Sequence, residues 1–112
     1  MRLLSSIGLA VALAFGATTA VYAAVDADAA QALMKKSDCF KCHAVDKDKK
    51  GPSYKKIASK HKGKADAEDK LVKAVTTNPK VKLDDGTEEE HKALKSTDAA
   101  AIKNVVLWVL AQ

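Results

Sequence analysis

The residues that most directly indicate chemistry are two cysteines and a histidine, in the order Cys39-Phe40-Lys41-Cys42-His43. A cysteine pair two residues apart, followed directly by histidine, is the attachment pattern of a c-type haem. Each thiol adds to one vinyl group of the porphyrin, and the two intervening residues form a turn that lets both sulfurs reach the same macrocycle edge. The next residue then lies under the iron. The sequence therefore predicts covalent attachment at Cys39 and Cys42 and a proximal iron ligand at His43.

Three other uses of the cysteine pair fit less well. A thioredoxin-type pair needs a βαβ setting, and the sequence shows no strand pattern. A zinc site needs four ligands, and His61 and His91 are the only further histidines available to complete one. A structural disulfide leaves the position of His43 unexplained. Haem is the interpretation that uses all three residues.

The segment 1–23 differs from the rest of the chain. Arg2 is the only charged residue before Asp26, and an apolar run extends from Ile7 to Phe15. Small residues precede a cut after Ala23 or the next alanine, as in a secretory signal peptide. The alternative, an uncleaved membrane anchor, is less favoured because the run is shorter than the ~20 residues of a span. We expect cleavage to leave a periplasmic domain, 24–112, without membrane insertion.

The composition of the expected domain is short of core-forming residues. The whole chain carries a net charge of +5, which falls by one when Arg2 is removed, and residues 24–112 hold three aromatic residues: Phe40, Tyr54 and Trp108. A domain of this size with so few large side chains generally needs a disulfide, a metal or a cofactor. The composition excludes a disordered chain, an integral membrane protein and a large catalytic scaffold.

The pattern of apolar and capping residues predicts helices and no strands. The expected helices run from Asp26 or Asp28 to Lys36, from Pro52 to Ser59, from Asp66 to Asn78, and from Asp98 to Ala111. The intervening segments 44–51 and 79–95 read as a polar loop and an irregular, highly charged stretch. The last helix has the clearest stripe, formed at helical spacing by Ile102, Val105, Val106, Val109 and Leu110. The expected fold class is all-α.

Residues 26–112 resemble a class I cytochrome c of the small bacterial monohaem type, related to cytochromes c5, c8 and c551. The matching pieces are the CFKCH motif, the segment Gly51-Pro52-Ser53-Tyr54-Lys55, and the final helix. The resemblance implies about four helices packed around one covalently attached haem c. It also implies that the first and last helices cross, with Met34 and Trp108 at their contact.

The resemblance gives a role to Pro52. In the family, the carbonyl of the corresponding proline accepts a hydrogen bond from the outer nitrogen of the proximal histidine. Such a bond fixes the imidazole ring and raises its basicity. We expect Pro52 to hold His43 in this way.

The distal iron ligand is where the sequence departs from the family. The usual ligand is a methionine in the loop before the last helix, but residues 44–112 contain no methionine, and Met34 lies on the helix leading to the proximal side. Counting back from the C-terminus, the position of the methionine falls on His91. The prediction is bis-histidine ligation by His43 and His91. The alternatives are an open site or a site filled by water or lysine; His61 is expected to be solvated.

Histidine in place of methionine has chemical consequences. Methionine raises the reduction potential of a haem, so an imidazole ligand should lower it relative to a His/Met relative. Glu88, Glu89 and Glu90 precede His91 and are expected to favour its protonated form, so that acid would detach it. The sequence leaves open whether His91 is permanently bound or exchangeable.

The predicted function is electron transfer rather than enzymatic turnover. We expect a monomeric periplasmic carrier that passes one electron between redox proteins, in a system that resembles those of metal oxidation or extracellular electron transfer. The alternatives are a haem sensor in which a small molecule displaces His91, and a cytochrome subunit of a larger oxidoreductase. Nucleic acid is not an expected partner, because the domain has no arginine and few aromatics for stacking.

The expected partners are proteins with acidic docking surfaces that bind transiently. Lysines surround the haem motif in the sequence, while five acids cluster at 84–90. Such asymmetry would orient a fast, weak encounter; the simpler interpretation is a solvated surface. The lysines concerned are Lys35, Lys36, Lys41, Lys47, Lys49, Lys50, Lys55 and Lys56.

Overall fold

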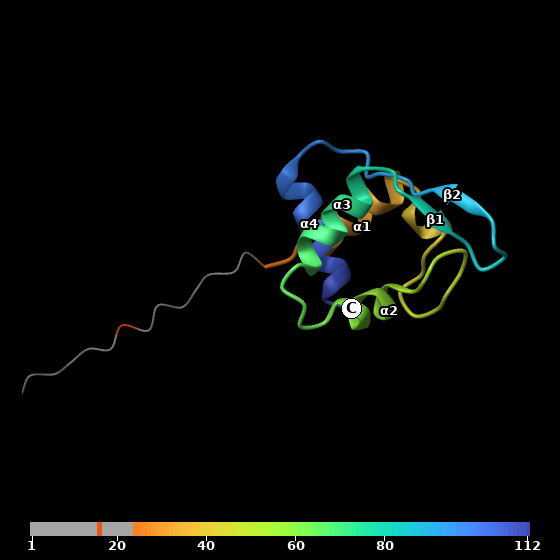
Figure 1. Cartoon of the computed structure of the whole chain (residues 1–112). Coiled ribbons are helices and arrows are strands. Elements are labelled where there is room, and N and C mark those ends of the chain that lie inside the picture. Colours follow the sequence, from red (N-terminus) through yellow and green to blue (C-terminus); the bar gives the residue numbers. More distant parts are fainter. Residues whose placement is uncertain (1–15, 17–23) are drawn as a thin grey trace, which may run out of the picture.

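The computed structural model describes residue 16 and residues 24–112 (Figure 1). The predicted signal peptide therefore lies outside the described residues, apart from Gly16. The elements, in chain order, are α1 (Ala27–Lys36), the 3₁₀ helix η1 (Cys39–Lys41), α2 (Tyr54–His61), α3 (Ala67–Thr76), β1 (Lys80–Lys82), β2 (Glu88–Glu90) and α4 (Ala99–Leu110). The predicted fold class, predominantly helical with four α-helices in the described part of the chain, is confirmed.

Helices α1 and α4 pack against each other and form the structural core. Asp26 caps α1 by accepting a hydrogen bond from the Ala29 N–H at 3.0 Å. The Asp26 backbone also exchanges two hydrogen bonds with the side chain of Asn104, at 2.9 and 2.8 Å, which ties the start of α1 to α4. Met34 and Trp108 are both buried in the shared apolar cluster, as expected of residues at this contact.

Helix α2 begins later than the sequence predicted. Its cap is Ser53, whose hydroxyl accepts a hydrogen bond from the Lys56 N–H at 3.1 Å, and Pro52 lies outside the helix. The prediction of Pro52 at the first helical position was wrong because the serine can satisfy a free N–H at the helix start, while proline only tolerates the absence of one. The helix also continues past Ser59 to His61.

Helix α3 ends at Thr76, two residues before Asn78, where the sequence predicted its end. Asn78 has a positive φ of 50°, and Pro79 follows it, so the chain leaves the helical conformation there. Asp66 stands at the cap position, but its carboxylate makes no capping hydrogen bond. It pairs instead with Lys70, one turn along the helix, at 3.1 Å.

A β-hairpin stands in the segment that was expected to be irregular (Figure 1). Strands β1 and β2 are antiparallel, with Lys80 opposite Glu90 and Lys82 opposite Glu88. Opposite charges that face each other across strands stabilise such a pair. The expectation of no strands was wrong because these short strands are mostly charged and lack the apolar alternation that signals a strand.

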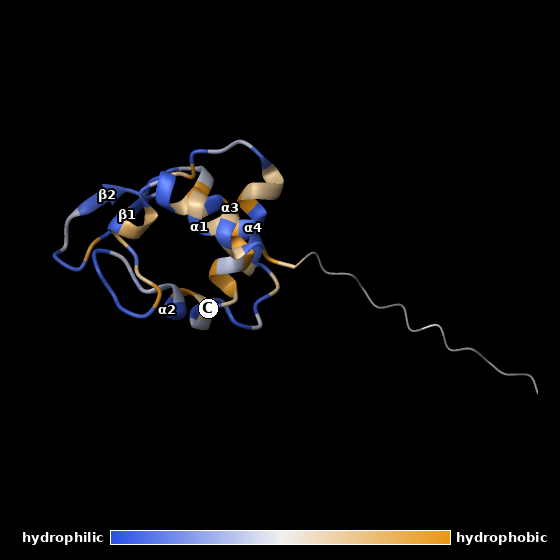
Figure 2. Ribbon diagram, turned by 180° about the vertical axis from the view of Figure 1, so that it is seen from behind, coloured by the Kyte–Doolittle hydropathy of each residue, from blue (hydrophilic) through white to orange (hydrophobic). Residues whose placement is uncertain are grey.

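Apolar residues gather on α1 and α4, while the hairpin is hydrophilic (Figure 2). Within the described part of the chain, no helix has the length and apolar character needed to cross a membrane. The buried apolar side chains of this small domain are concentrated where α1 and α4 meet.

Replacing Met34 by alanine should lower the free energy of unfolding of the haem-loaded protein by about 2–5 kcal/mol, because the side chain is 1% exposed and its loss leaves a cavity. Denaturant unfolding measures the difference. The exposed neighbour provides the control, since Lys35→Ala should change stability by less than about 0.5 kcal/mol. Equal stability of the Met34→Ala variant and the parent would contradict this packing.

Candidate haem site

The cysteine-histidine motif folds as a tight turn between α1 and the following loop. Asp38 adopts a left-handed conformation with φ of 61°, which aspartate tolerates better than most residues. The N–H groups of Cys42 and His43 then both donate to the Cys39 carbonyl, at 3.3 and 3.0 Å. This turn brings both cysteines and His43 to the wall of one cavity.

The cavity has a volume of about 410 Å³ and is walled by all four α-helices, the motif turn and the β-hairpin. Its lining is mainly apolar, with a few polar groups that include His43, His61 and His91. A mainly apolar cavity of this size with few polar groups is typical of a cofactor site. The predicted motif residues and the predicted distal histidine, far apart in sequence, therefore meet at one place.

Both cysteines are free thiols at the edge of this cavity and are half-buried. Burial raises the pKa of the Cys39 thiol, and the nearby Asp38 carboxylate acts in the same direction. No disulfide joins Cys39 and Cys42, so both sulfurs are available for thioether bonds. Within the described residues, no group of three or more His, Cys, Asp or Glu side chains is placed to hold a bare metal ion.

His43 is held by the loop that follows it. Its Nδ1 lies 2.6 Å from the Pro52 carbonyl oxygen, which can only accept, so Nδ1 carries the proton and donates. This is the contact that the family resemblance implied. In the neutral ring, this contact leaves Nε2 as the nitrogen that can bind a metal.

Gly51 gives the imidazole of His43 its space. A Cβ atom at this position would lie 2.6 Å from Cε1 of His43 and 3.0 Å from Nδ1. Any side chain there would displace the ring. The glycine of the Gly-Pro-Ser-Tyr segment is therefore required by close approach rather than by an unusual backbone conformation.

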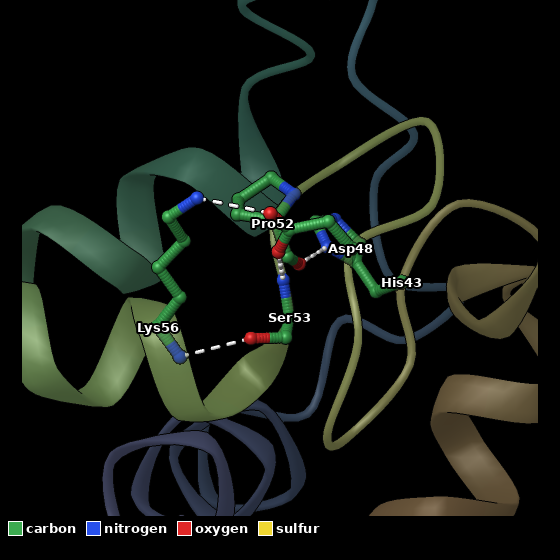
Figure 3. Close-up of polar contacts among 5 residues, drawn as sticks. All are labelled: His43, Asp48, Pro52, Ser53 and Lys56. Carbon is green, nitrogen blue, oxygen red and sulfur yellow. Dashed lines mark hydrogen bonds and ion pairs between the residues drawn. The ribbon is translucent and has the colours of Figure 1, made fainter.

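Asp48 ties together the loop that carries Pro52 (Figure 3). Its Oδ1 accepts the Ser53 N–H at 2.8 Å, and its Oδ2 pairs with Lys56 at 2.9 Å. The hydrogen bond from Lys56 and that from Ser53 lower the pKa of the Asp48 carboxyl. Sequence reasoning missed Asp48. One of its partners is a backbone N–H, and the other is one of many lysines, so no pattern in the sequence marks the contact.

His91 lies just past β2, and hydrogen bonds to Pro79 and Asn78 position its backbone. Its N–H donates to the Pro79 carbonyl at 2.8 Å, and its carbonyl accepts from Asn78 Nδ2 at 3.0 Å. The ring Nδ1 donates to the Ala74 carbonyl at 2.9 Å. Nε2 of His91, like that of His43, is thereby left as the unprotonated nitrogen.

The environment of His91 favours the neutral ring. Burial lowers the pKa of His91, and the neighbouring His43 lowers it further, while the Ala74 hydrogen bond opposes this. The expectation that Glu88, Glu89 and Glu90 would favour the protonated form was wrong, because all three are exposed to solvent on β2 and burial outweighs their charge.

The two imidazoles lie on the same cavity with ring centres 6.0 Å apart and planes at 59°. A metal ion held between two imidazole nitrogens, about 2 Å from each, requires a ring separation of roughly 6 Å. The arrangement of His43 and His91 fits a haem iron between them. The other candidate near the cavity is Met34, the sole methionine of residues 24–112, which also contributes to the lining.

His61 was expected to be solvated, and this was wrong. Helix α2 extends to His61 and turns its side chain into the cavity wall, where Nδ1 is buried without a hydrogen-bond partner in the described structure. The sequence signal that was available is its spacing of seven residues from Tyr54, which places both on one helix face.

The lysines around the motif form a weaker positive field than their number indicates. Lys41, Lys55 and Lys56 pair with aspartates, and Lys49 donates to the Phe40 carbonyl at 2.8 Å. Five of the eight lysines, Lys49 included, form no ion pair within the described residues; the other four are Lys35, Lys36, Lys47 and Lys50.

Residues 27–111 match the family model described as Cytochrome c, and the chain belongs to this family. Among solved structures, it is similar to class 1 cytochrome MtoD from Sideroxydans lithotrophicus ES-1, at 56% identity and a TM-score of 0.76, covering 79% of this chain and 97% of that one. It is also similar to cytochrome c552 of Nitrosomonas europaea, at 26% identity and a TM-score of 0.58, over 72% and 96% of the two chains. Cytochrome c-551 of Allochromatium vinosum is 35% identical over 94 residues, covering 84% of this chain and 97% of that one.

Membership of this family defines the cofactor and the class of activity. The chain is a small class I cytochrome c that carries one covalently bound haem c with its iron, and it is an electron carrier rather than an enzyme. The mainly apolar cavity, the free thiols and the clearance that Gly51 leaves for His43 all fit this group.

Gly51→Ala should displace the His43 ring and weaken its bond to iron, because the added methyl group would lie within 3.1 Å of three ring atoms. The optical spectrum of the ferric protein should shift partly from low spin to high spin. Ser59→Ala, on the far side of α2, serves as the control and should leave the spectrum unchanged. A fully low-spin Gly51→Ala protein would show that the ring has room to move.

Asp48→Asn should reduce stability at neutral pH and remove part of its acid dependence. Because the folded-state pKa of Asp48 is lowered, its contribution is present above about pH 4 and is lost as the pH falls through the folded-state value. Unfolding free energies measured from pH 7 to pH 3 test this. Asp46→Asn, which breaks an exposed pair with Lys55, should have little effect; equal effects of the two variants would contradict the role of Asp48.

Proposed function

We propose that this protein is a periplasmic one-electron carrier whose haem c is attached at Cys39 and Cys42 and ligated by His43 and His91. The observation that carries the proposal is the pair of imidazoles 6.0 Å apart on one cavity. Each ring donates from Nδ1 to a backbone carbonyl, so that each presents Nε2. Two independent contacts that select the same nitrogen support a metal-binding role for both rings.

The protein contributes fixed geometry to electron transfer. Haem iron supplies the chemistry, by alternating between Fe(III) and Fe(II). The Pro52 and Ala74 carbonyls hold the ligand rings in place, so little rearrangement is needed when the charge of the site changes. Two protein ligands also leave no iron position for a substrate, which suits a carrier.

The identity of the distal iron ligand determines whether the reduction potential of the haem is raised or lowered. Methionine raises the reduction potential of a haem, and imidazole, a better donor to ferric iron, lowers it. Burial of His91 keeps its ring neutral and able to bind. We therefore expect a more reducing potential than that of a His/Met relative.

The location and pathway are inferred from the chain's N-terminal segment and its relatives. The apolar segment 1–23 has the pattern of a cleavable export signal, which supports a periplasmic site. The pathway we propose, a metal-oxidising or extracellular electron-transfer chain, follows from the resemblance of the sequence to the cytochromes of such systems, and the chain is 56% identical to class 1 cytochrome MtoD. The lysines near the motif without an ion pair in the described residues are the cations available to attract a partner's acidic surface; they are Lys35, Lys36, Lys47, Lys49 and Lys50.

His91→Ala should convert the ferric protein from a low-spin to a high-spin form, because the iron loses its distal ligand. Low-temperature EPR and the optical spectrum measure the change. His61→Gln is the matched control, a histidine of the same cavity whose replacement should leave the low-spin signal intact. A His91→Ala protein that stays low-spin, with the spectrum of methionine ligation, would instead assign the distal position to Met34.

His91→Met should raise the reduction potential, since a thioether favours ferrous iron relative to imidazole. Spectroelectrochemical titration measures the shift, and the appearance of a methionine-ligated spectrum is the control for correct binding. A potential that falls or stays unchanged, with methionine bound, would contradict histidine ligation in the parent.

A further inference from the structure

Ser37, at the C-terminal end of α1, is the most deeply buried polar residue in the described part of the chain, with 1% of its surface exposed. Its hydroxyl donates to the Leu33 carbonyl at 2.8 Å and accepts the Lys95 N–H at 2.9 Å. A hydroxyl has one proton and two lone pairs, so it can serve both partners at once. The second bond joins residues 58 positions apart and connects α1 to the segment that follows His91.

The segment 91–95, which we call the distal segment, adopts neither helix nor strand and is held from two sides (Figure 1). The Leu94 N–H donates to the Val75 carbonyl at 2.9 Å, one residue along α3 from the acceptor of the His91 ring. The Leu94 side chain is buried in the apolar cluster. On the other side, the hydroxyl of Ser37 binds the last residue of the distal segment. The distal segment thus bridges α3 and α1.

Ser37 also adjoins the haem attachment motif, because Cys39 is two residues further along the chain. An ion pair between Lys92 and Asp38, at 3.5 Å, crosses from the distal segment to the same turn, but both side chains meet solvent and such pairs contribute little. The Ser37 bond is shielded from water, so moving the distal segment away deprives a buried oxygen of its donor. Ser37 is therefore the stronger link between the attachment turn and the distal segment.

We propose that Ser37 is a positioning residue for the distal ligand: by anchoring the distal segment to α1, it keeps His91 in place and limits its exchange for an external ligand. The inference rests on the proposed ligation by His91. For the His91 ring to leave the cavity, the distal segment must move away from its anchors on α3 and α1. Loss of the Ser37 hydroxyl removes one anchor, so opening becomes more frequent while the closed geometry is retained. Such anchoring suits a carrier rather than a sensor.

The test uses cyanide as the external ligand and the ferric, haem-loaded protein. Because His91 must leave before cyanide binds, the rate of binding reaches a limit at high cyanide concentration, and this limit measures how often His91 dissociates. Ser37→Ala should raise the limiting rate about 2- to 10-fold, the range expected for the loss of one hydrogen bond, with the resting low-spin spectrum unchanged. Ser37→Thr keeps the hydroxyl and should retain the limiting rate of the parent.

Asn104→Ala is the matched control. It also removes hydrogen bonds to α1, the two between the Asn104 side chain and the Asp26 backbone, but at the start of the helix. It should lower the free energy of unfolding and leave the limiting cyanide rate unchanged. Hydrogen exchange of the Lys95 amide, followed by NMR of the ferrous protein, reports the anchor directly. This exchange should become faster in Ser37→Ala and stay unchanged in Asn104→Ala.

Three results would overturn the proposal, and they separate it from the ligand assignment. If the parent shows a bis-histidine EPR signal but Ser37→Ala binds cyanide at the parent's rate, the anchoring role is refuted and the ligation by His91 stands. Equal acceleration in Asn104→Ala would show that the rate follows overall stability rather than this bond. A parent without the bis-histidine signal would refute both the ligation and the anchoring inferred from it.

Discussion

The two imidazole-to-carbonyl hydrogen bonds are the interactions that fix the geometry of the candidate haem site. Pro52 holds His43 from one side and Ala74 holds His91 from the other, with 2.6 and 2.9 Å between the bonded atoms. Both acceptors are backbone carbonyls. The orientation of both rings is therefore set by the course of the backbone, in the loop before α2 for Pro52 and in α3 for Ala74.

Each carbonyl is positioned by a different device. The loop carrying Pro52 is braced by Asp48, which binds the Ser53 N–H and Lys56 at the start of α2. Ala74 lies in the last turns of α3, and the strand after it pairs with β2 so that His91 returns to the same helix. The hairpin thus carries the chain from the end of α3 out and back to His91, with Lys80 opposite Glu90 and Lys82 opposite Glu88 across the strands.

The cavity and the hydrophobic core are parts of one structure. Helices α1 and α4 pack closely through Met34, Val105 and Trp108, and the cavity of about 410 Å³ lies directly beside this cluster. With three aromatic residues in residues 24–112, the chain has little else with which to fill that space. A haem there contributes apolar surface to folding as well as the redox centre.

The sequence by itself determined the class of the protein, the attachment motif and the helices, because these depend on short-range spacing: two cysteines and a histidine within five residues, and an apolar stripe over Ile102 to Val109. It also pointed to His91 through the absence of a methionine. The tertiary structure alone decided the β-hairpin and the contact between His91 and the Ala74 carbonyl. Strand pairing, backbone carbonyl placement and burial arise between segments distant in sequence, so local patterns carry no record of them. The sequence also did not show that aspartates pair with Lys41, Lys55 and Lys56 in the folded chain and so neutralise part of the positive charge near the motif.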